Sequence, residues 1–303
     1  MTSISCCVVL ADEQQSRLQQ GAGDWDVRFQ DPAERSDCPV VFGNPEPDVV
    51  AANQGLRWMQ LESVGFGEYS DLDLSRPDGV VQVTNLAGFF ADPVAETALA
   101  GLLALGRGID RLAVLQKRAA WVGDPLREDL RLLKGARVLL FGFGAINRRV
   151  AELLAPFGCR IDHLASGWTD DALDAALVDA DILIATAPDT PKTRGLFGQA
   201  RLARMKPGAV FCNFGRGSLV DEAALARALQ VGELGGAVID VTENEPLPAD
   251  HAFWCCPNTI VTQHSAGGTA DELDRKIDVF LDNLIGYRAG EPLGGLVDFA
   301  KGY

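Results

Sequence analysis

The chain from about residue 137 onward alternates short apolar runs with segments whose apolar residues recur at helical spacing. Residues 138–141 (VLLF) and the helix-patterned segment 145–157 form the clearest pair. Short uninterrupted apolar runs are typical of parallel strands that are buried on both faces. This alternation predicts a doubly wound parallel sheet of the Rossmann type. Further strands are expected at 160–164, 181–187, 209–213, 237–241 and 259–262, with a helix over 219–229.

The first 90 residues carry a weaker pattern of the same kind. Short strands are expected at 4–10, 40–42, 56–61 and 80–83, with one weak helix near 48–54. Connections rich in proline, glycine and aspartate separate these segments. A chain of 303 residues is long enough for two domains of ordinary size. We therefore expect a small α/β unit before the larger sheet.

A strongly apolar helix is expected between the two units. Asp92 as N-cap and Pro93 at the first helical position give it a favourable start. Residues 94–105 carry little polar surface on any face. Such a helix is expected to be buried all round, at a domain junction or a subunit contact.

Composition and charge exclude several classes of protein. The net charge of −15 argues against non-specific binding to nucleic acid and against anionic membrane surfaces. No apolar segment reaches the ~18 residues that a membrane span needs, and the N-terminus does not resemble a signal peptide. The seven cysteines form no C-x-x-C motif, and their odd number makes a poor disulfide framework. Cys6, Cys7 and Cys212 are expected to be buried thiols, which predicts a cytosolic protein.

The turn after the 138–141 strand is the first candidate for binding chemistry. Gly142, Phe143 and Gly144 follow the strand and precede the helix. In this context glycines permit a tight turn and let backbone N–H groups approach a pyrophosphate. The third glycine of a dinucleotide fingerprint is replaced by Asn147. A plain strand-to-helix turn is the alternative interpretation.

The end of the 160–164 strand bears on the choice of cofactor. An acidic residue here usually bonds the ribose hydroxyls of NAD. The chain instead continues with Ala165, Ser166 and Gly167. No arginine or lysine that would bind a 2′-phosphate follows before Lys192. The sequence therefore leaves NAD and NADP open.

Three polar residues recur just past the ends of successive predicted strands: Arg216, Glu245 and His264. This edge of an open α/β sheet is where ligands bind. A cation, a carboxylate and an imidazole suit hydride chemistry at a carbinol, because the imidazole exchanges the hydroxyl proton and the cation holds anionic oxygens. Each residue alone has a plain alternative, as a surface arginine, a solvated glutamate or an inert loop histidine. Their shared position favours the catalytic interpretation.

Beyond these residues the chain resembles the D-isomer-specific 2-hydroxyacid dehydrogenase family, which includes glyoxylate/hydroxypyruvate reductases and phosphoglycerate dehydrogenases. The similarity extends over most of the chain from about Leu61. It rests on VTNLAGFFADPVAETALAGLLAL (83–105), GFGAI (142–146), APDTPKTRGL (187–196), MKPGAVFCNFGRGSLVDEAALARAL (205–229), IDVTENEPLP (239–248) and TQHSAGGT (262–269).

The resemblance implies a role for each matching residue. Arg216 would bind the substrate carboxylate and carbonyl oxygen, His264 would be the acid/base, and Glu245 would pair with it. Val64 and Gly65 would offer backbone N–H groups to the carboxylate, although the residues alone favour a simple turn there. The expected cofactor contacts are Gly142, Phe143, Gly144, Ala145, Ile146, Ala165, Ser166, Ala187, Pro188, Thr193, Phe214, Gly215, Arg216, Asp240, His264 and Gly267.

The resemblance also implies an organisation. Residues 1–90 and 272–303 would form a flavodoxin-like substrate domain, and 91–271 the dinucleotide-binding domain. Members of the family usually dimerise through the cofactor domain, so a homodimer is expected. Asp240 would lie by the nicotinamide. The sequence contains no cluster of metal ligands, so no metal is expected.

Several departures from the family pattern predict a more open cofactor site. Asn147 in place of glycine is expected to loosen the packing of the helix or shift the pyrophosphate. Gln263 stands where the family usually has proline, so the His264 loop is expected to be less rigid. The ribose-binding acid is absent. The segment 164–181 is short and lacks a helix–strand piece that normally walls the adenosine half.

The sequence therefore predicts an NAD(P)-dependent oxidoreductase. It would transfer a hydride between the nicotinamide and C2 of a small 2-oxo or D-2-hydroxy acid. The alternative is a non-catalytic, dinucleotide-sensing binding protein on the same fold, because fold alone does not fix function.

Overall fold

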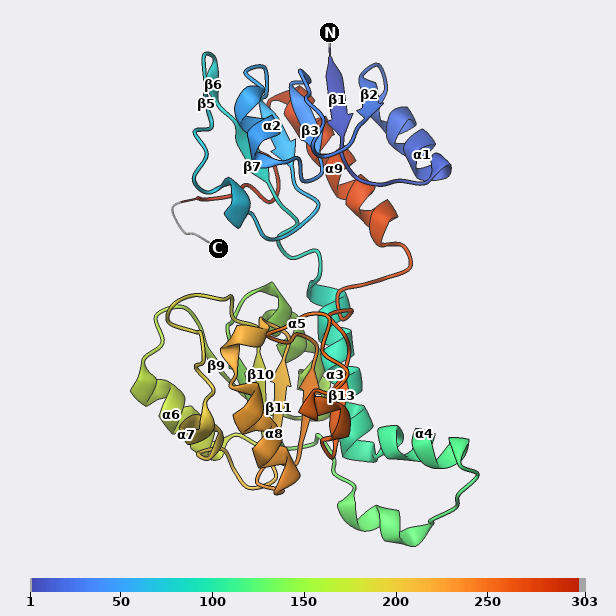
Figure 1. Ribbon diagram of the computed structural model, residues 1–303, viewed down its shortest axis with the longest axis vertical. Helices are drawn as coiled ribbons and strands as arrows, with labels where there is room; N and C mark the ends of the chain where they lie inside the picture. The colour runs from blue at the N-terminus through green and yellow to red at the C-terminus, as the bar shows by residue number, and fades with distance from the viewer. Residues whose placement is uncertain (1, 300–303) are drawn as a thin grey trace. The chain divides into compact units, whose positions relative to one another are not determined.

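The computed structural model describes residues 2–299, which fall into two compact units (Figure 1). The first unit contains the residues up to Phe89 and those from Thr269 onward, and the second runs from Phe90 to Gly268. Each unit is built on its own parallel sheet flanked by helices. The predicted α/β class, with a Rossmann-type sheet and a smaller flavodoxin-like unit made from both chain ends, is confirmed.

The first unit has a five-stranded parallel sheet in the order β2-β1-β3-β4-β7. Numbered along the chain, this is the order 2-1-3-4-5 of flavodoxin-like folds. A two-stranded antiparallel hairpin, β5–β6, lies outside the sheet. The elements are β1 (Ser3–Cys6), α1 (Asp12–Ala22), β2 (Asp26–Phe29), β3 (Val40–Phe42), α2 (Pro47–Ala52), β4 (Trp58–Gln60), the 3₁₀ turn η1 (Gly67–Tyr69), β5 (Ser75–Arg76), β6 (Gly79–Val80), β7 (Gln82–Thr84) and α9 (Glu272–Ala289).

Helix α9 attaches the end of the chain to the sheet of its beginning. The ring of Phe280 stacks on Phe42 at 4.5 Å and on Trp58 at 5.2 Å between centroids. All three side chains are fully buried, together with Ile277. Burial of aromatic side chains of this size dominates the energetics of a small core. The first unit therefore depends on both ends of the chain.

The sequence pattern does not predict several elements of the first unit, including α1, β2 and α9. Helix α1 buries only Leu18 and Ala22, so its sequence shows almost no apolar periodicity. Strand β2 is the edge of the sheet and alternates Asp26 and Arg28 with its apolar residues. Strand β1 ends at Cys6, earlier than the predicted residue 10.

The second unit has a six-stranded parallel sheet in the order β13-β12-β11-β10-β8-β9. Its elements are α3 (Ala91–Arg107), α4 (Ile109–Lys117), β8 (Arg137–Phe141), α5 (Ala145–Leu154), β9 (Arg160–Leu164), α6 (Asp170–Asp179), β10 (Ile182–Ala185), α7 (Gln199–Leu202), β11 (Val210–Asn213), α8 (Glu222–Gln230), β12 (Gly236–Ile239) and β13 (Thr259–Val261), with 3₁₀ turns η2 (Asp124–Asp129), η3 (Ala155–Phe157), η4 (Gly217–Leu219) and η5 (Ala252–Cys255). All six predicted strands are present within two residues of their expected bounds.

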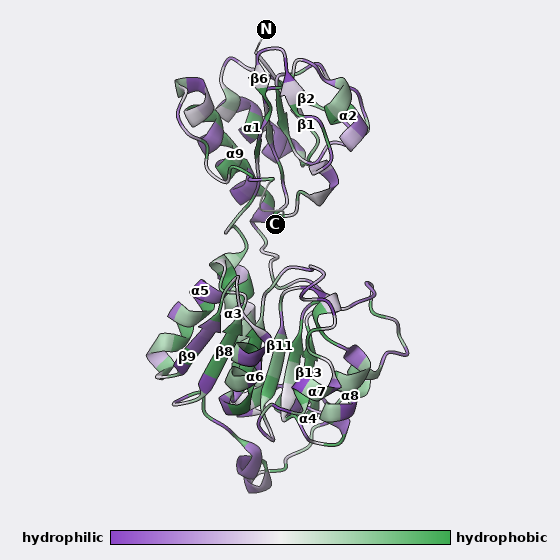
Figure 2. Ribbon diagram, turned by 90° about the vertical axis from the view of Figure 1, so that its left-hand side faces the viewer, coloured by the Kyte–Doolittle hydropathy of each residue, from purple (hydrophilic) through white to green (hydrophobic). Residues whose placement is uncertain are grey.

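Strand order in this sheet reverses at β8. The chain passes from β8 to β9 on one side and then returns across to β10 on the other. A crevice outside the carboxyl ends of strands at such a switch point is the usual ligand site of open α/β sheets. Strand β9 forms the edge of the sheet, and the short segment after it forms one helix, α6, that leads directly to β10. In Figure 2 the inner strand β11 is hydrophobic, whereas polar residues interrupt β9.

Within this single chain, helix α3 is buried on one face, so its predicted burial all round at a subunit contact stays a prediction. Gly101 faces the sheet so closely that a Cβ there would lie 2.8 Å from a Val238 methyl carbon. The positions outside the buried face are half-buried or exposed within this chain. The predicted N-cap is wrong: the N-cap is Phe90, and Asp92 lies in the first turn, where it pairs with Arg149 at 2.7 Å.

Two further findings concern the whole of residues 2–299. No helix in that range is long and apolar enough to cross a membrane. Cys6, Cys7 and Cys212 are buried free thiols, as the sequence predicted.

Candidate active site

The glycine turn after β8 is shaped for close backbone approach. Gly142 has φ +83°, and a Cβ there would lie 2.8 Å from the amide nitrogen of Ala187. Only glycine tolerates both conditions at once. The turn is therefore packed directly against the segment that follows β10.

The N-terminus of α5 offers room for an anion. Gly144 is the N-cap, makes no side-chain capping bond, and is exposed. A Cβ on Gly144 would meet nothing within 4 Å. The first N–H groups of a helix lack partners inside the helix and attract anions such as a pyrophosphate. The expected contacts from Gly142 to Ile146 thus fit the diphosphate of a dinucleotide.

Asn147 takes the place of the third glycine without opening the structure. It is fully buried, and its Nδ2 donates to the carbonyl oxygens of Gly142 at 2.8 Å and of Phe141 and Ile184 at 3.2 Å. The expectation that this residue loosens the packing of the helix is therefore wrong, because its amide joins the ends of β8 and β10 to α5. Its Oδ1 is buried without a partner among the described residues.

One cation, Lys192, lies at the turn after β9 in the folded structure, although it is distant from that turn in the sequence. Residues 165–168 close a turn in which Trp168 N donates to Ala165 O at 3.3 Å. Lys192 lies 24 positions further along, but its Nζ donates to Trp168 O at 2.6 Å and lies 3.9 Å from the centroid of the Trp168 ring. Thr193 fixes the loop beneath it, with Oγ1 donating to Pro188 O at 2.7 Å. The loops after β9 and β10 therefore meet at Lys192.

The loop after β11 presents Arg216 to solvent. Asn213 shapes this loop, since its Oδ1 accepts from Gly215 N at 3.1 Å and its Nδ2 donates to Arg216 O at 2.9 Å. Gly217 follows, and a Cβ on it would lie 2.0 Å from the carbonyl carbon of Thr242. The Arg216 loop thus packs backbone to backbone on the loop after β12. Arg216 makes no ion pair with any residue from 2 to 299.

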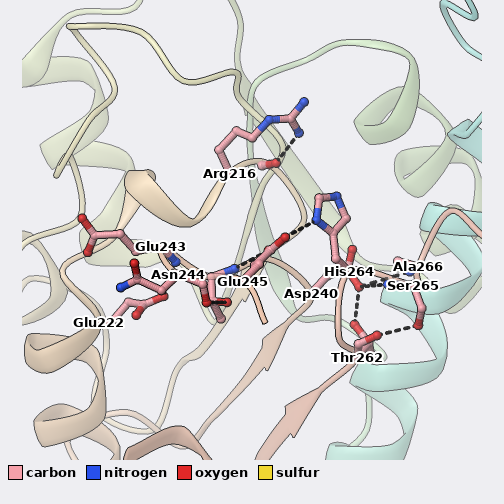
Figure 3. A network of polar contacts seen from close by, with 12 residues as sticks. Arg216, Glu222, Asp240, Glu243, Asn244, Glu245, Thr262, His264, Ser265 and Ala266 are labelled. Carbon is pink, nitrogen blue, oxygen red and sulfur yellow. Dashed lines mark hydrogen bonds and ion pairs between the residues drawn. The ribbon is translucent and has the colours of Figure 1, made fainter. Parts of the chain in front are cut away.

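Glu245 and His264 form a hydrogen-bonded pair across two loops (Figure 3). His264 Nδ1 lies 2.7 Å from Glu245 Oε2, and the other carboxylate oxygen accepts from Thr242 N at 2.9 Å. The imidazole is 54% exposed, so its Nε2 is free to meet a ligand. Burial alone would raise the pKa of the Glu245 carboxyl, but the hydrogen bonds from His264 and Thr242 and the charge of Arg216 outweigh burial and lower it. Glu245 is therefore an anionic acceptor at neutral pH.

Asp240 holds the loop that carries His264. Its Oδ1 accepts from Thr262 Oγ1 at 2.6 Å and from the N–H groups of Ser265 and Ala266 at 3.1 Å each (Figure 3). Its main-chain oxygen accepts from His264 N at 2.6 Å. This buried carboxylate is the hub of the loop, a role the sequence did not reveal because its partners lie more than twenty positions away.

Gln263 has a backbone conformation that a proline at this position could not adopt. Gln263 and His264 have φ of +57° and +53°, in the left-handed region. Proline is locked near −65° and cannot adopt such a value. The expectation of a less rigid loop is not supported, because the four bonds to Asp240 close it.

The structure places the predicted second-unit site residues along one edge of the sheet, in the loops after β8 to β13. The two other histidines lie away from the Glu245 pair: His163 stacks on Phe143 at 3.9 Å, and His251 pairs with Glu222. Val64 and Gly65 belong to the first unit, where both are exposed. Val64 O accepts from Asn85 Nδ2 at 2.7 Å, and Gly65 faces open space. Among residues 2–299 no three histidine, cysteine or acidic side chains gather as a metal site.

Chemically, this arrangement can move a proton beside an anion site. With Nδ1 bonded to a carboxylate, the imidazole can give or take a proton only at Nε2. Arg216 supplies a fixed positive charge from the neighbouring loop, in a geometry suited to carboxylate oxygens. The open N-terminus of α5 lies on the same sheet edge.

Comparison with known proteins agrees with this geometry. The model for "D-isomer specific 2-hydroxyacid dehydrogenase, NAD binding domain" matches residues 99–266, more than half of the chain. The chain therefore belongs to the D-isomer specific 2-hydroxyacid dehydrogenase family, as the sequence resemblance predicted. The matched region is the family's NAD binding domain, so the predicted dinucleotide chemistry is confirmed at the level of the family.

Individual relatives cover nearly the same length. Glyoxylate/hydroxypyruvate reductase B of Pectobacterium carotovorum is 31% identical, with 82% of this chain and 81% of that protein aligned. Glyoxylate/hydroxypyruvate reductase A of Serratia proteamaculans is 29% identical, with 97% and 96% aligned. Among solved structures, a D-isomer specific 2-hydroxyacid dehydrogenase from Xanthobacter autotrophicus, in complex with NADPH and MES, has a TM-score of 0.78 at 27% identity, covering 100% of this chain and 99% of that one.

The contacts of Asn147 generate a stability prediction. Asn147→Ala removes the amide Nδ2 that donates to the carbonyl oxygens of Gly142, Phe141 and Ile184, and an intramolecular hydrogen bond contributes about 0.5–1.5 kcal/mol net. We expect the free energy of unfolding of the second unit to fall by about that amount in urea titrations. The control is Asn244→Ala, an exposed asparagine, which should change little. Unchanged or increased stability of Asn147→Ala would show that the amide bonds contribute nothing.

Proposed function

We propose that this protein is an NAD(P)H-dependent reductase of small 2-oxo acids that also oxidises the corresponding D-2-hydroxy acids. The observation that carries the proposal is the 2.7 Å pair of His264 and Glu245 beside the unpaired cation Arg216. Two relatives are named glyoxylate/hydroxypyruvate reductase, which supports a substrate whose carboxylate adjoins a carbonyl.

In the reduction, His264 supplies the proton and the bound nicotinamide supplies the hydride. The Nε2–H of the imidazolium donates to the substrate carbonyl oxygen as C2 gains hydrogen, and the product is a hydroxyl group and a neutral imidazole. Glu245 keeps the Nδ1 proton in place and stabilises the imidazolium before transfer. Arg216 holds the carboxylate and neutralises charge that develops on the carbonyl oxygen. The oxidation runs through the same atoms in reverse.

The remaining site assignments come from the family resemblance. Val64 and Gly65 are proposed to bind the substrate carboxylate through their N–H groups. Ala187, Pro188 and Gly267 are proposed to line the cofactor, and Asp240 to lie by the nicotinamide. The open space over Gly144 supports the part of this assignment that concerns the pyrophosphate.

Lys192 favours NADPH within this proposal. No carboxylate stands between Leu164 and Trp168, so nothing in that turn repels a 2′-phosphate. The contacts of Lys192 are a carbonyl and an aromatic ring, and it forms no ion pair with any of residues 2–299. Its positive charge is therefore available to a phosphate at the turn after β9.

A homodimer through the second unit is proposed as well. Helix α4 and the loop after it extend from the sheet (Figure 1) and expose large apolar side chains, with Trp121 95% and Leu132 69% exposed. An apolar groove of about 110 Å³ at the base of this arm is lined by Leu102, Leu133 and Phe157, among others. Exposed apolar surface of this extent marks a contact site, and the half-exposed side of α3 adds to it.

The first prediction of this proposal concerns proton transfer by His264. His264→Ala should lower kcat by about 100- to 10,000-fold, the usual loss when a general acid/base is removed. The far-ultraviolet circular dichroism spectrum should stay unchanged. The measurement is steady-state reduction of glyoxylate and hydroxypyruvate. Near wild-type turnover would overturn the role of His264 as the acid/base, whereas cofactor binding without turnover in the wild type would favour a dinucleotide-sensing binding protein.

The second prediction concerns cofactor choice. Fluorescence titration should show tighter binding of NADPH than of NADH to the wild type. Lys192→Ala should weaken NADPH binding by roughly tenfold, because a charge-assisted bond is worth about 1.5–3 kcal/mol and exposure reduces it. NADH binding should not change, and the exposed Lys134→Ala should affect neither. Equal losses for both cofactors would remove Lys192 from phosphate recognition.

The third prediction concerns assembly. Light scattering coupled to size exclusion should give twice the 32.4 kDa chain mass for the wild type. Trp121→Asp combined with Leu132→Asp should shift the protein towards the monomer, because charge in an apolar contact is costly. Val231→Asp, at an apolar position 69% exposed on another part of the same unit, is the control. A wild-type mass of one chain would contradict the dimer.

A further inference from the structure

The structure contains a second carboxylate–histidine pair, Glu222 and His251, in addition to Glu245 and His264. Glu222 is the first residue of α8, and its side chain is 9% exposed. Glu222 Oε2 lies 3.2 Å from His251 Nε2, and Oε1 accepts from the backbone N–H of Glu243 at 2.9 Å. Both carboxylate oxygens are therefore engaged, one by a side chain and one by the main chain.

The N–H group that Glu222 binds belongs to the turn that carries Glu245. Within this turn Thr242 N donates to Glu245 Oε1, and Thr242 Oγ1 donates to Asn244 O at 3.0 Å. Glu243 lies between them, with its side chain exposed (Figure 3). The bond from Glu243 N to Glu222 therefore fixes the middle of the turn to the start of α8.

The same turn is confined from the other side by the Arg216 loop. A Cβ on Gly217 would lie 2.2 Å from Glu243 N and 2.0 Å from the Thr242 carbonyl carbon. The space beside Gly217 is therefore filled by the backbone of this turn, so the turn has no room to move towards Gly217. Helix α8 follows directly after that loop, so Glu222 joins the loop of Arg216 and the turn of Glu245 into one unit.

His251 determines how the buried carboxylate is satisfied. Its Nδ1 accepts from Phe253 N at 3.3 Å, so Nδ1 carries no proton, and the proton lies on Nε2 facing Glu222. The ring also packs at 4.7 Å against the buried Phe253. Burial raises the pKa of the Glu222 carboxyl, and the bonds from Glu243 N and His251 offset part of that rise. A buried carboxylate is tolerated where such bonds satisfy it.

We propose that Glu222, supported by His251, is a positioning residue that holds the Glu245 carboxylate in line with His264. This inference rests on the proposed function, because it concerns how the acid/base pair of that site is kept in register. Among residues 2–299, Glu222 forms no hydrogen bond or ion pair with His264 or Arg216, and it acts through the backbone of Glu243. Its effect should therefore pass entirely through Glu245.

A double-mutant cycle with the full-length protein tests this. Glu222→Ala should lower kcat for 2-oxo acid reduction by about tenfold, which corresponds to one lost hydrogen bond, with KM for the cofactor unchanged. In a Glu245→Gln background, Glu222→Ala should have no further effect on kcat. Glu222→Gln, which keeps an acceptor for Glu243 N, should retain most of the activity.

The controls separate this inference from the proposed function. Glu233→Ala, an exposed glutamate of the same unit, should leave kcat unchanged. If Glu222→Ala does not fold, Glu222→Asp, which retracts the acceptor by one methylene, serves in the same cycle. Additive losses in the cycle would refute the positioning role of Glu222. Failure of the wild type to reduce any 2-oxo acid would instead refute the reductase itself.

Discussion

The site depends on one constraint, the parallel register of β11, β12 and β13. Pairing aligns Asn213 with Ile239, and Ile239 with Val261, so the three strands end at one level. Each strand is followed at once by a loop that carries one polar member of the site. β11 is buried from Phe211 to Asn213 and β12 along its whole length, whereas β13 is half-buried at the edge of the sheet. The pairing of these strands thus brings the three loops to one edge of the sheet.

Main-chain contacts then hold these loops to one another. Gly217 brings the first loop against the second, and Asp240 at the start of the second accepts three bonds to Oδ1 from the third. The third loop also contains two consecutive non-glycine residues in the left-handed region, Gln263 and His264, each costing about 1–3 kcal/mol. Such conformations persist where the surroundings over-determine them, which the bonds to Asp240 do here. The imidazole is therefore presented by a strained but closed loop.

How far the sequence predicts this structure depends on where each interaction partner lies. The strands of the second unit follow from local apolar runs, and the three polar site residues follow from their place after those runs. Helix α1 cannot be predicted from apolar periodicity, because only Leu18 and Ala22 face the core. For the apolar helix α3, the sequence does not say which of its faces the same chain covers.

Contacts between distant positions are the other limit of the sequence. Asn147 looked like a defect of a glycine motif, yet its amide bonds Ile184, 37 positions away. Lys192 looked too late in the chain to matter to the turn after β9, yet it bonds Trp168. Nothing in either local pattern marks these bonds, because they arise only when separate strands are brought side by side.

Except for Gln263, which lies in the loop after β13, the departures from the family pattern lie on one half of the sheet. The missing acid, the edge position of β9 and the short return through α6 all concern β8, β9 and the start of β10. The hydrogen bonds that orient His264 involve only β12, β13 and their loops. Both halves belong to one sheet, but no side-chain hydrogen bond of the His264–Glu245 pair reaches the half formed by β8 and β9. A change in how the adenosine end is recognised can therefore alter cofactor affinity and preference while the geometry of proton transfer is kept.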